Sequence, residues 1–477
     1  MCSWKQYPVN EVRVLSENKN IDALDEKFVR MTQAPVERLV CSMAGPSIAI
    51  MMISGLYNMA DTYFVGSIGT QATAAVGVSF SLMAIIQALG FFFGQGSGSY
   101  ISRQLGAHNW EKATAMATTG FLSCCFAGAA VTGAGLLFLE PVARFLGATE
   151  TILPYACDYL FYIFIGAPWM AGSLVLNNQL RFQGSAFYGM LGMISGAVLN
   201  VGLDPLFIFT FGMGVKGASL ATMLSQLVSC GLLLVGCTRK GNIRIDLRFF
   251  SPRFALYREI MRGGFPSFCR QGLSSVATIC INQVAGGFGD AAIAAMSIVQ
   301  RVTMFANSAL LGFGQGFQPV CGFNYGARLY GRVRKALWFC VKTSFVVLLA
   351  IAIGGFLFAP QIVELFRDDS AVIRIGTLAL RLRCISFPLM GWVILNNMMM
   401  QTIGKAGKAT ILALAWQGLF LLPCIFVLTP LLGILGVQMS QPVSDLATFA
   451  LSVPLGAGVL REMKMNETRG LPPSTPS

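Results

Sequence analysis

The chain has 477 residues, of which 55% are hydrophobic and only 12% are charged, and its formal net charge is +13. Soluble proteins carry roughly a quarter charged residues, so this composition excludes a large soluble core. The basic residues cluster in alternate loops between apolar runs, which favours membrane topology over nucleic-acid binding as the origin of the net charge.

Residues 1–38 are polar and contain no apolar signal-peptide core, so they predict a cytoplasmic N-terminal tail. Apolar runs of about 20 residues then recur as far as Leu460, each long enough to cross a hydrocarbon layer of roughly 30 Å. Long runs rich in Leu, Ala, Gly and Met predict an all-α polytopic membrane protein and not a β-barrel. The twelve predicted transmembrane helices lie near residues 39–65, 72–102, 113–139, 152–178, 186–210, 216–238, 260–287, 291–323, 335–359, 371–402, 406–429 and 432–459.

These helices divide into two groups of six. An N-lobe is predicted over residues 39–238, a basic cytoplasmic linker over residues 239–259 and a C-lobe over residues 260–460. Residues 461–477 resemble a disordered cytoplasmic tail. The positive-inside rule places both termini and the linker in the cytoplasm, and we expect a multi-pass protein of a bacterial inner membrane.

The positions of the cysteines and the histidine in the sequence give little support to a metal site or a catalytic site. The 13 cysteines lie mostly inside apolar runs, and the single histidine, His108, lies in a loop. Buried cysteines of this kind behave as small hydrophobic residues, and no set of nucleophile, base or metal ligands is present in the sequence. We therefore expect neither an enzyme nor a cofactor.

The chain repeats itself at a spacing of 220 residues. Prolines and glycines coincide at this offset, as the pairs Pro46 and Pro266, and Gly69 and Gly289, illustrate. Each half has an even number of predicted helices, so both halves enter the membrane in the same direction. This arrangement is a parallel repeat about an axis along the membrane normal, which is known among secondary transporters.

Four segments carry a resemblance to a known family. "GPSIAIMMISGLYNMADTYFVG", "LRFQGSA", "LNVGLDPLFIF" and "GFGQGFQPVCGFNYGA" resemble the signature segments of the multidrug and toxic compound extrusion (MATE) family. The resemblance extends over about residues 35 to 455. It implies two six-helix lobes around a central cavity and export driven by inward H⁺ or Na⁺.

Polar residues that break the repeat are the candidates for function. Asp61 corresponds to Ile281, Asn200 to Phe420 and Asp204 to Cys424. Asn200 and Asp204 are four residues apart and share one helix face, as do Tyr57 and Asp61. Oxygen ligands suit a hard cation, and a desolvated carboxylate also has a raised proton affinity. The alternative is that both acids merely cap helix ends near the outer surface.

The resemblance implies a cation- or proton-responsive pocket in the N-lobe. Carried over position by position, it implicates Tyr57, Asp61, Asn200, Asp204 and Thr222, and less securely Asn177 or Asn178. Pro46 lies 15 residues before Asp61 and could bend the first helix when that acid is protonated. It is a feature of the fold first, because Pro266 repeats it without an accompanying acid.

The C-lobe carries charges of its own inside predicted helices, namely Arg301, Arg381, Arg383 and Asp445. Isolated charges at that depth are costly, so we expect Asp445 to pair with an arginine, with Arg301 and Arg381 nearest the midplane. Such a pair could be a structural lock or could serve substrate binding or coupling. The second lobe lacks the extra carboxylates that some branches of the family use for Na⁺, which favours H⁺ over Na⁺ and leaves transient Na⁺ binding at the N-lobe residues open.

The sequence thus predicts a secondary antiporter that exports small amphipathic, often cationic, compounds by alternating access, acting as a monomer in the lipid bilayer. The first rival is a flippase for lipid-linked saccharides, in which Arg301 and Arg381 could hold a phosphate. A membrane-embedded enzyme lacks a catalytic constellation, and a channel does not explain two six-helix halves with acids on one side.

Overall fold

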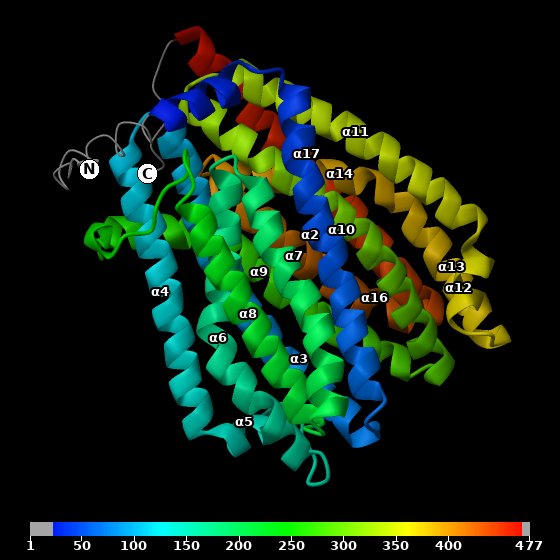
Figure 1. The fold of residues 1–477 in the computed structure, drawn as a ribbon. Helices are drawn as coiled ribbons and strands as arrows, with labels where there is room; N and C mark the ends of the chain where they lie inside the picture. Colours follow the sequence, from blue (N-terminus) through cyan, green and yellow to red (C-terminus); the bar gives the residue numbers. More distant parts are fainter. Residues whose placement is uncertain (1–21, 470–477) are drawn as a thin grey trace, which may run out of the picture.

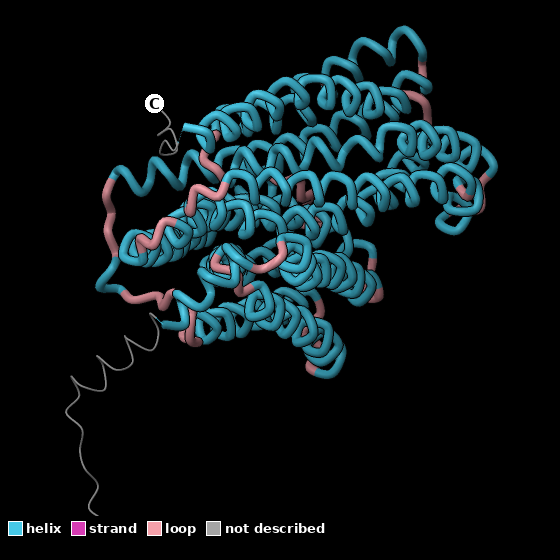
Figure 2. Tube along the Cα trace, turned by 90° about the horizontal axis from the view of Figure 1, so that it is seen from above, coloured by secondary structure: helices cyan, strands magenta, loops and turns pink. Residues whose placement is uncertain are grey.

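The computed structural model describes residues 22–469. Within this range the regular secondary structure is helical throughout, and Figure 2 shows long helices joined by loops. The two described ends, dark blue and red in Figure 1, lie at the same end of the helix bundle, which we call the tail end. The predictions for residues 1–21 and 470–477 concern residues outside the described range.

The N-lobe follows the predicted order of six long helices. A helix over residues 22–33 precedes them at the tail end. The lobe consists of α2 (Val36–Gly66), α3 (Thr70–Gly106), α4 (Trp110–Leu137), the short α5 (Leu139–Phe145), α6 (Leu153–Phe182), α7 (Ala186–Pro205), the π-helical turn η1 (Leu206–Thr210) and α8 (Val215–Cys237).

The C-lobe repeats this order after the linker, which contains the short 3₁₀ turn η2 (Leu247–Phe249). It consists of α9 (Phe254–Gly286), α10 (Asp290–Gly326), α11 (Tyr330–Leu357), α12 (Ala359–Phe366), α13 (Ser370–Ser386), η3 (Phe387–Leu389), α14 (Met390–Thr402), α15 (Ala406–Leu414), η4 (Ala415–Leu419), α16 (Leu421–Leu432) and α17 (Ile434–Arg469). In Figure 1 the cyan and green helices form one side of the molecule and the yellow to red helices form the other.

Four predicted elements differ in detail. The predicted helix over residues 186–210 consists of α7 and η1, and the one over residues 406–429 consists of α15, η4 and α16. The tenth predicted helix is divided into α13, η3 and α14 around Pro388, a residue with no backbone N–H to donate. The predicted disordered tail is wrong for its first part, because α17 continues as a helix to Arg469.

Ten helices in the described range are long and apolar enough to cross a membrane. The remaining two predicted spans, α9 and α10, have 33 and 37 residues and are sufficiently long. α9 packs along α3, and α10 packs along α2. The two helices thus face the other lobe, and a polar face there meets protein instead of lipid.

The repeat appears in space as a reciprocal contact between α3 and α10. A Cβ atom added at Gly106 would lie 2.1 Å from the carbonyl oxygen of Phe323, and one added at Gly326 would lie 2.1 Å from that of Arg103. Both the glycines and the carbonyl residues are 220 positions apart in the sequence. The two helices therefore cross with backbone against backbone, and any side chain larger than glycine would separate them.

Polar contacts join the lobes near the tail end. One guanidinium nitrogen of Arg103 lies 2.8 Å from the Glu259 carboxylate on α9, and another donates to the carbonyl of Thr402 at 2.6 Å. Arg181, from α6, donates to the Gln318 side chain at 2.9 Å and to the Gln315 carbonyl at 3.0 Å, both on α10. We call these contacts the tail-end seam.

Candidate functional site

A pocket in the N-lobe lies between α2, α7 and α8. It is small, with a volume of about 20 Å³ available to the centre of a water molecule. Its walls combine small residues of α7, such as Gly196, with hydroxyl and amide side chains of all three helices, and the lining residues are Ser54, Tyr57, Met193, Gly196, Ala197, Asn200, Thr222, Ser225, Gln226 and Ser229. Three of the predicted site residues, Tyr57, Asn200 and Thr222, thus line one space.

Asn200 is the centre of the polar contacts in this pocket. Its side-chain Nδ2 lies 3.4 Å from Oδ1 of Asp204, one helical turn further along α7, and 3.3 Å from Oγ1 of Thr222 on α8. The four-residue spacing predicted the first contact. The second shows that α8 supplies a hydroxyl to the same group.

The two predicted acids are buried beside this pocket. The exposed fraction is 4% for Asp61 and 0% for Asp204. Their carboxylates interact electrostatically with one another, and Tyr57 interacts with both. The structure therefore brings the acids of α2 and α7 together, as the sequence predicted.

Several oxygens of the cluster lack partners. Among the described residues, Oδ1 of Asp61, Oδ2 of Asp204 and Oδ1 of Asn200 are buried and accept no hydrogen bond. Buried polar groups are normally hydrogen-bonded, and each exception calls for an explanation such as a bound ion or proton. The burial of both acids also gives no support to the alternative that they cap helix ends near the surface.

The backbone changes its helical form directly after Asp204. α7 ends at Pro205, which has no N–H to donate, and the chain continues as the π-helical turn η1. Such turns widen the helix by one residue and occur often at functional sites.

Sequence reasoning missed Tyr159 of α6. This tyrosine is fully buried and interacts electrostatically with Asp61 and Asp204. The criterion of broken symmetry would have found it, because its counterpart in the repeat is Ala379.

Two other predicted residues lie elsewhere. Asn178 belongs to the tail-end seam, where its Oδ1 accepts hydrogen bonds from Gln95 at 3.1 Å and from Arg181. Asn177 lies against Gly189 of α7, and Gly189 is 11 residues from Asn200, roughly 16 Å along the helix. Neither asparagine lines the pocket of Tyr57, Asn200 and Thr222, and a role of either one in coupling stays a prediction.

Pro46 lies inside α2, which passes through it without a break. The neighbouring turns touch α10 closely, since a Cβ atom added at Gly312 would lie 2.7 Å from Cα of Ile48 and one added at Gly316 would lie 2.5 Å from Cα of Ala44. The proline thus lies where the lobes meet, and its role in bending the helix stays a prediction.

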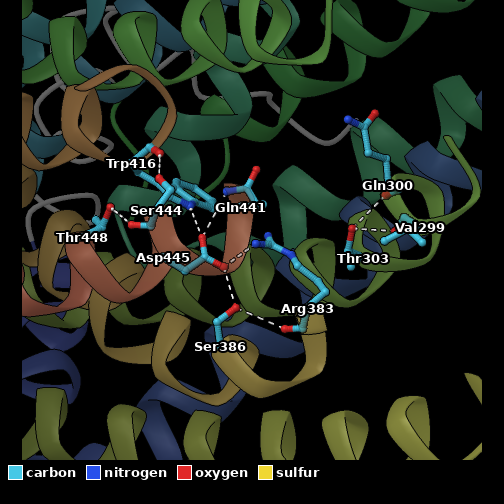
Figure 3. A network of polar contacts seen from close by, with 10 residues as sticks. All are labelled: Val299, Gln300, Thr303, Arg383, Ser386, Trp416, Gln441, Ser444, Asp445 and Thr448. Atoms are coloured by element: carbon cyan, nitrogen blue, oxygen red, sulfur yellow. Dashed lines mark hydrogen bonds and ion pairs between the residues drawn. The ribbon is translucent and has the colours of Figure 1, made fainter. Parts of the chain in front are cut away.

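The C-lobe contains the expected pair of Asp445 and an arginine, but the partner is Arg383 (Figure 3). One carboxylate oxygen of Asp445 accepts from Arg383 and from Ser386 at 2.8 Å. The other accepts from the Trp416 indole at 2.9 Å and from Gln441 at 3.1 Å. Every acceptor site of this buried carboxylate is thus used by side chains of α13, η4 and α17.

The arginines expected to pair with Asp445 do not. Arg381 is half-buried, donates to the Phe356 carbonyl at 3.2 Å and lies over the Phe356 ring. Arg301 is exposed on α10. The two arginines on which the flippase alternative depends are therefore not brought into one buried site.

The two lobes fill corresponding space differently. Gly196 and Ser225, which line the N-lobe pocket, correspond at the 220-residue offset to Trp416 and Asp445. A bulky indole and an ion pair thus occupy the place that is hollow in the N-lobe. For divalent metals, the described range contains no cluster of three or more His, Cys, Asp or Glu side chains.

Comparison with known proteins agrees with this architecture. The MatE family model matches the chain twice, over residues 46–206 and 266–427. The multidrug export protein MepA of Staphylococcus saprophyticus is 28% identical over 440 residues, which cover 92% of this chain and 97% of that protein. MepA of Staphylococcus aureus strain N315 is 27% identical over 449 residues, covering 94% and 99%.

Solved structures show the same fold. One is the outward-facing conformation of a multidrug resistance MATE family transporter, with a TM-score of 0.85, 29% identity and coverage of 92% of this chain and 98% of that chain. A transporter of the MOP superfamily from Pyrococcus furiosus also has a TM-score of 0.85 and 29% identity, covering 91% and 98%. The two family matches begin 220 residues apart and together span more than half of the sequence, so the chain belongs to the MatE family, the multidrug and toxic compound extrusion transporters.

Proposed function

We propose that the chain is a secondary antiporter that exports small amphipathic, often cationic, compounds from the cytoplasm in exchange for inward H⁺ or Na⁺. The observation that carries the proposal is the pair of buried acids, Asp61 and Asp204, found in one lobe only. The curated relatives, which match over nearly their whole length, are named multidrug export proteins, and this supports drugs as the class of substrate.

The N-lobe cluster supplies the coupling chemistry. A buried carboxylate without a compensating charge costs several kcal/mol, and Asp61 and Asp204 have unpartnered oxygens among the described residues. A proton or a Na⁺ ion removes that cost. We place H⁺ first, because the C-lobe offers no comparable acids: its buried Asp445 is already occupied by Arg383.

Alternating access follows from the position of the lobes. The positive-inside rule favours a cytoplasmic tail end, and in that orientation the contacts of the tail-end seam hold the two lobes together on the cytoplasmic side. For a compound to enter from the cytoplasm, the contacts of Arg103 with Glu259 and of Arg181 with Gln318 must break. Both lobes belong to one chain, so a monomer is sufficient for the cycle.

Helix α2 connects the coupling cluster to the seam between the lobes. It carries Asp61 toward its far end and packs against α10 on both sides of Pro46. An ion shifts a conformational equilibrium only through its different affinities for the two states. A proton or Na⁺ bound at the two acids must therefore favour one packing of α2 against α10 over the other.

Export of a fluorescent organic cation from proteoliposomes tests the proposal, with pH and Na⁺ gradients imposed separately. We expect Asp61→Asn and Asp204→Asn to abolish gradient-driven export. The matched control is Asp290→Asn, an exposed acid in the first turn of α10, which should export normally. Undiminished export in both pocket variants would refute the coupling site, and export insensitive to both gradients would refute the antiporter.

A further inference from the structure

The linker between the lobes, residues 239–253, is held firmly against the N-lobe. The backbone N–H of Ile243 donates to Gln183 at 2.7 Å, and that of Ser251 donates to the hydroxyl of Thr119 on α4 at 3.1 Å. The Asn242 side chain donates to the Gly236 carbonyl at 2.8 Å. A connection needed only to join two lobes would not require these anchors, so the linker presents a fixed outer surface.

That outer surface is both basic and apolar. Arg244, Arg248 and Arg253 are exposed, and none forms an ion pair with another residue of the 22–469 range. Between and beside them lie large apolar side chains with high exposed fractions: Leu247 73%, Phe249 47% and Phe254 82%. Exposed apolar groups of this size mark an interaction surface when they gather in one place.

The depth of the linker along α4 places this surface at the edge of the bilayer. A hydrocarbon layer of roughly 30 Å needs about 20 helical residues, and 20 residues counted back from Leu137, the last of α4, reach Thr118. On α4, Thr118 and Thr119 accept hydrogen bonds from the linker. Phe250 extends deeper, with its ring 6.4 Å from that of Phe126.

The side chains of the linker at this depth indicate which kind of partner binds it. The linker follows α8 directly, and its lysine and arginine side chains outnumber its single acid, Asp246. Basic clusters immediately after a transmembrane helix attract anionic lipids, while aromatic side chains prefer the interface. A soluble acidic protein would satisfy the arginines but leave the apolar side chains without a matching environment.

We propose that the linker is a docking surface for anionic phospholipid headgroups of the leaflet at the tail end. Arg244, Arg248 and Arg253 contact the lipid phosphates. Leu247 and Phe249 of the linker, together with Phe254 at the start of α9, insert among the upper acyl carbons. This surface is separate from the coupling pocket, so it stands whether or not the proposed antiport is correct.

The test measures binding of fluorescent phosphatidylglycerol and phosphatidylcholine to the full-length protein in neutral detergent. We expect tighter binding of phosphatidylglycerol, weakened by salt. The triple variant Arg244→Gln, Arg248→Gln, Arg253→Gln should lose about five-fold in affinity per arginine, on the order of a hundred-fold in all. Leu247→Ser with Phe249→Ser should weaken binding of both lipids.

A matched triple variant controls for net charge. Lys112→Gln, Arg461→Gln and Lys464→Gln remove three exposed cations at the tail end outside the linker, and this protein should bind phosphatidylglycerol within two-fold of the wild type. Circular dichroism confirms that each variant is folded. Equal affinity for the two lipids, equal losses in the two triple variants, or displacement of the lipid by soluble glycerol phosphate or an acidic peptide would each overturn the proposal.

Discussion

Replacement of Asp445 by alanine should destabilise the C-lobe strongly without removing transport from the molecules that remain folded. The side chain of Asp445 is fully buried, and that of its partner Arg383 has an exposed fraction of only 9%. The variant therefore leaves a guanidinium inside the lobe without its counter-charge. Breaking a buried ion pair in this way costs about 3–5 kcal/mol, so we expect the free energy of unfolding to fall by that amount.

The assay is unfolding by sodium dodecyl sulfate in mixed micelles, with three comparison variants. Arg383→Met combined with Asp445→Leu removes both charges, although the Trp416 indole still loses its acceptor. The free energy of unfolding of this double variant should be at least about 2 kcal/mol higher than that of Asp445→Ala. Arg374→Gln, an exposed arginine on the same helix, should change stability by at most about 0.5 kcal/mol. Equal losses of stability in Asp445→Ala and in the double variant would refute the reasoning. A loss of export per folded molecule would instead assign the pair to coupling.

Three further predictions concern the tail end. Gly106→Ala should weaken the closed seam and increase the population of molecules that are open at the tail end, measured as a spin-label distance between the lobes. Gly77→Ala, which has nothing within 4 Å of the added Cβ, should leave that distance unchanged. Glu259→Gln removes the charge that faces Arg103 and should shift the same distance in the same direction; an unchanged distance would contradict the assignment of the seam. Burial lowers the pKa of Lys27 from 10.5 to about 7, so the unfolded chain binds more protons between these pH values and stability should rise with pH across this window. The Lys27→Met variant should lose that part of the pH slope, and an unaltered slope would contradict the assignment.

The sequence predicted most of the fold because length and hydropathy determine it. A run of about 20 apolar residues has few alternatives to a membrane helix, and each predicted span matches a helix or a broken pair of helices in the structure. The 220-residue repeat predicted two lobes with the same order of helices, and the reciprocal contacts of Gly106 and Gly326 agree with that repeat.

Contacts of the site were predicted correctly where the spacing of residues along one helix determines them. They were missed where they depend on which side of a helix faces its neighbours. Asn200 and Asp204 share a face of α7 by their spacing alone. Arg381 and Arg383 are two residues apart, so they point to different sides of α13, and only the packed structure shows that Arg383 faces Asp445. Asn177 and Asn178 present the same difficulty on α6, where the contacts of neighbouring helices decide what each side chain meets.

The reciprocal contact between α3 and α10 has the geometry of a twofold homodimer, in which each subunit presents the same glycine to the same carbonyl of the other. The lobes therefore recognise one another through their own surfaces, and the linker, which is attached to the N-lobe alone in the hydrogen bonds described above, adds no information about how they dock. Two chains separated within the linker carry all the complementary surface that a functional pair requires, so co-expressed halves should assemble into the same molecule.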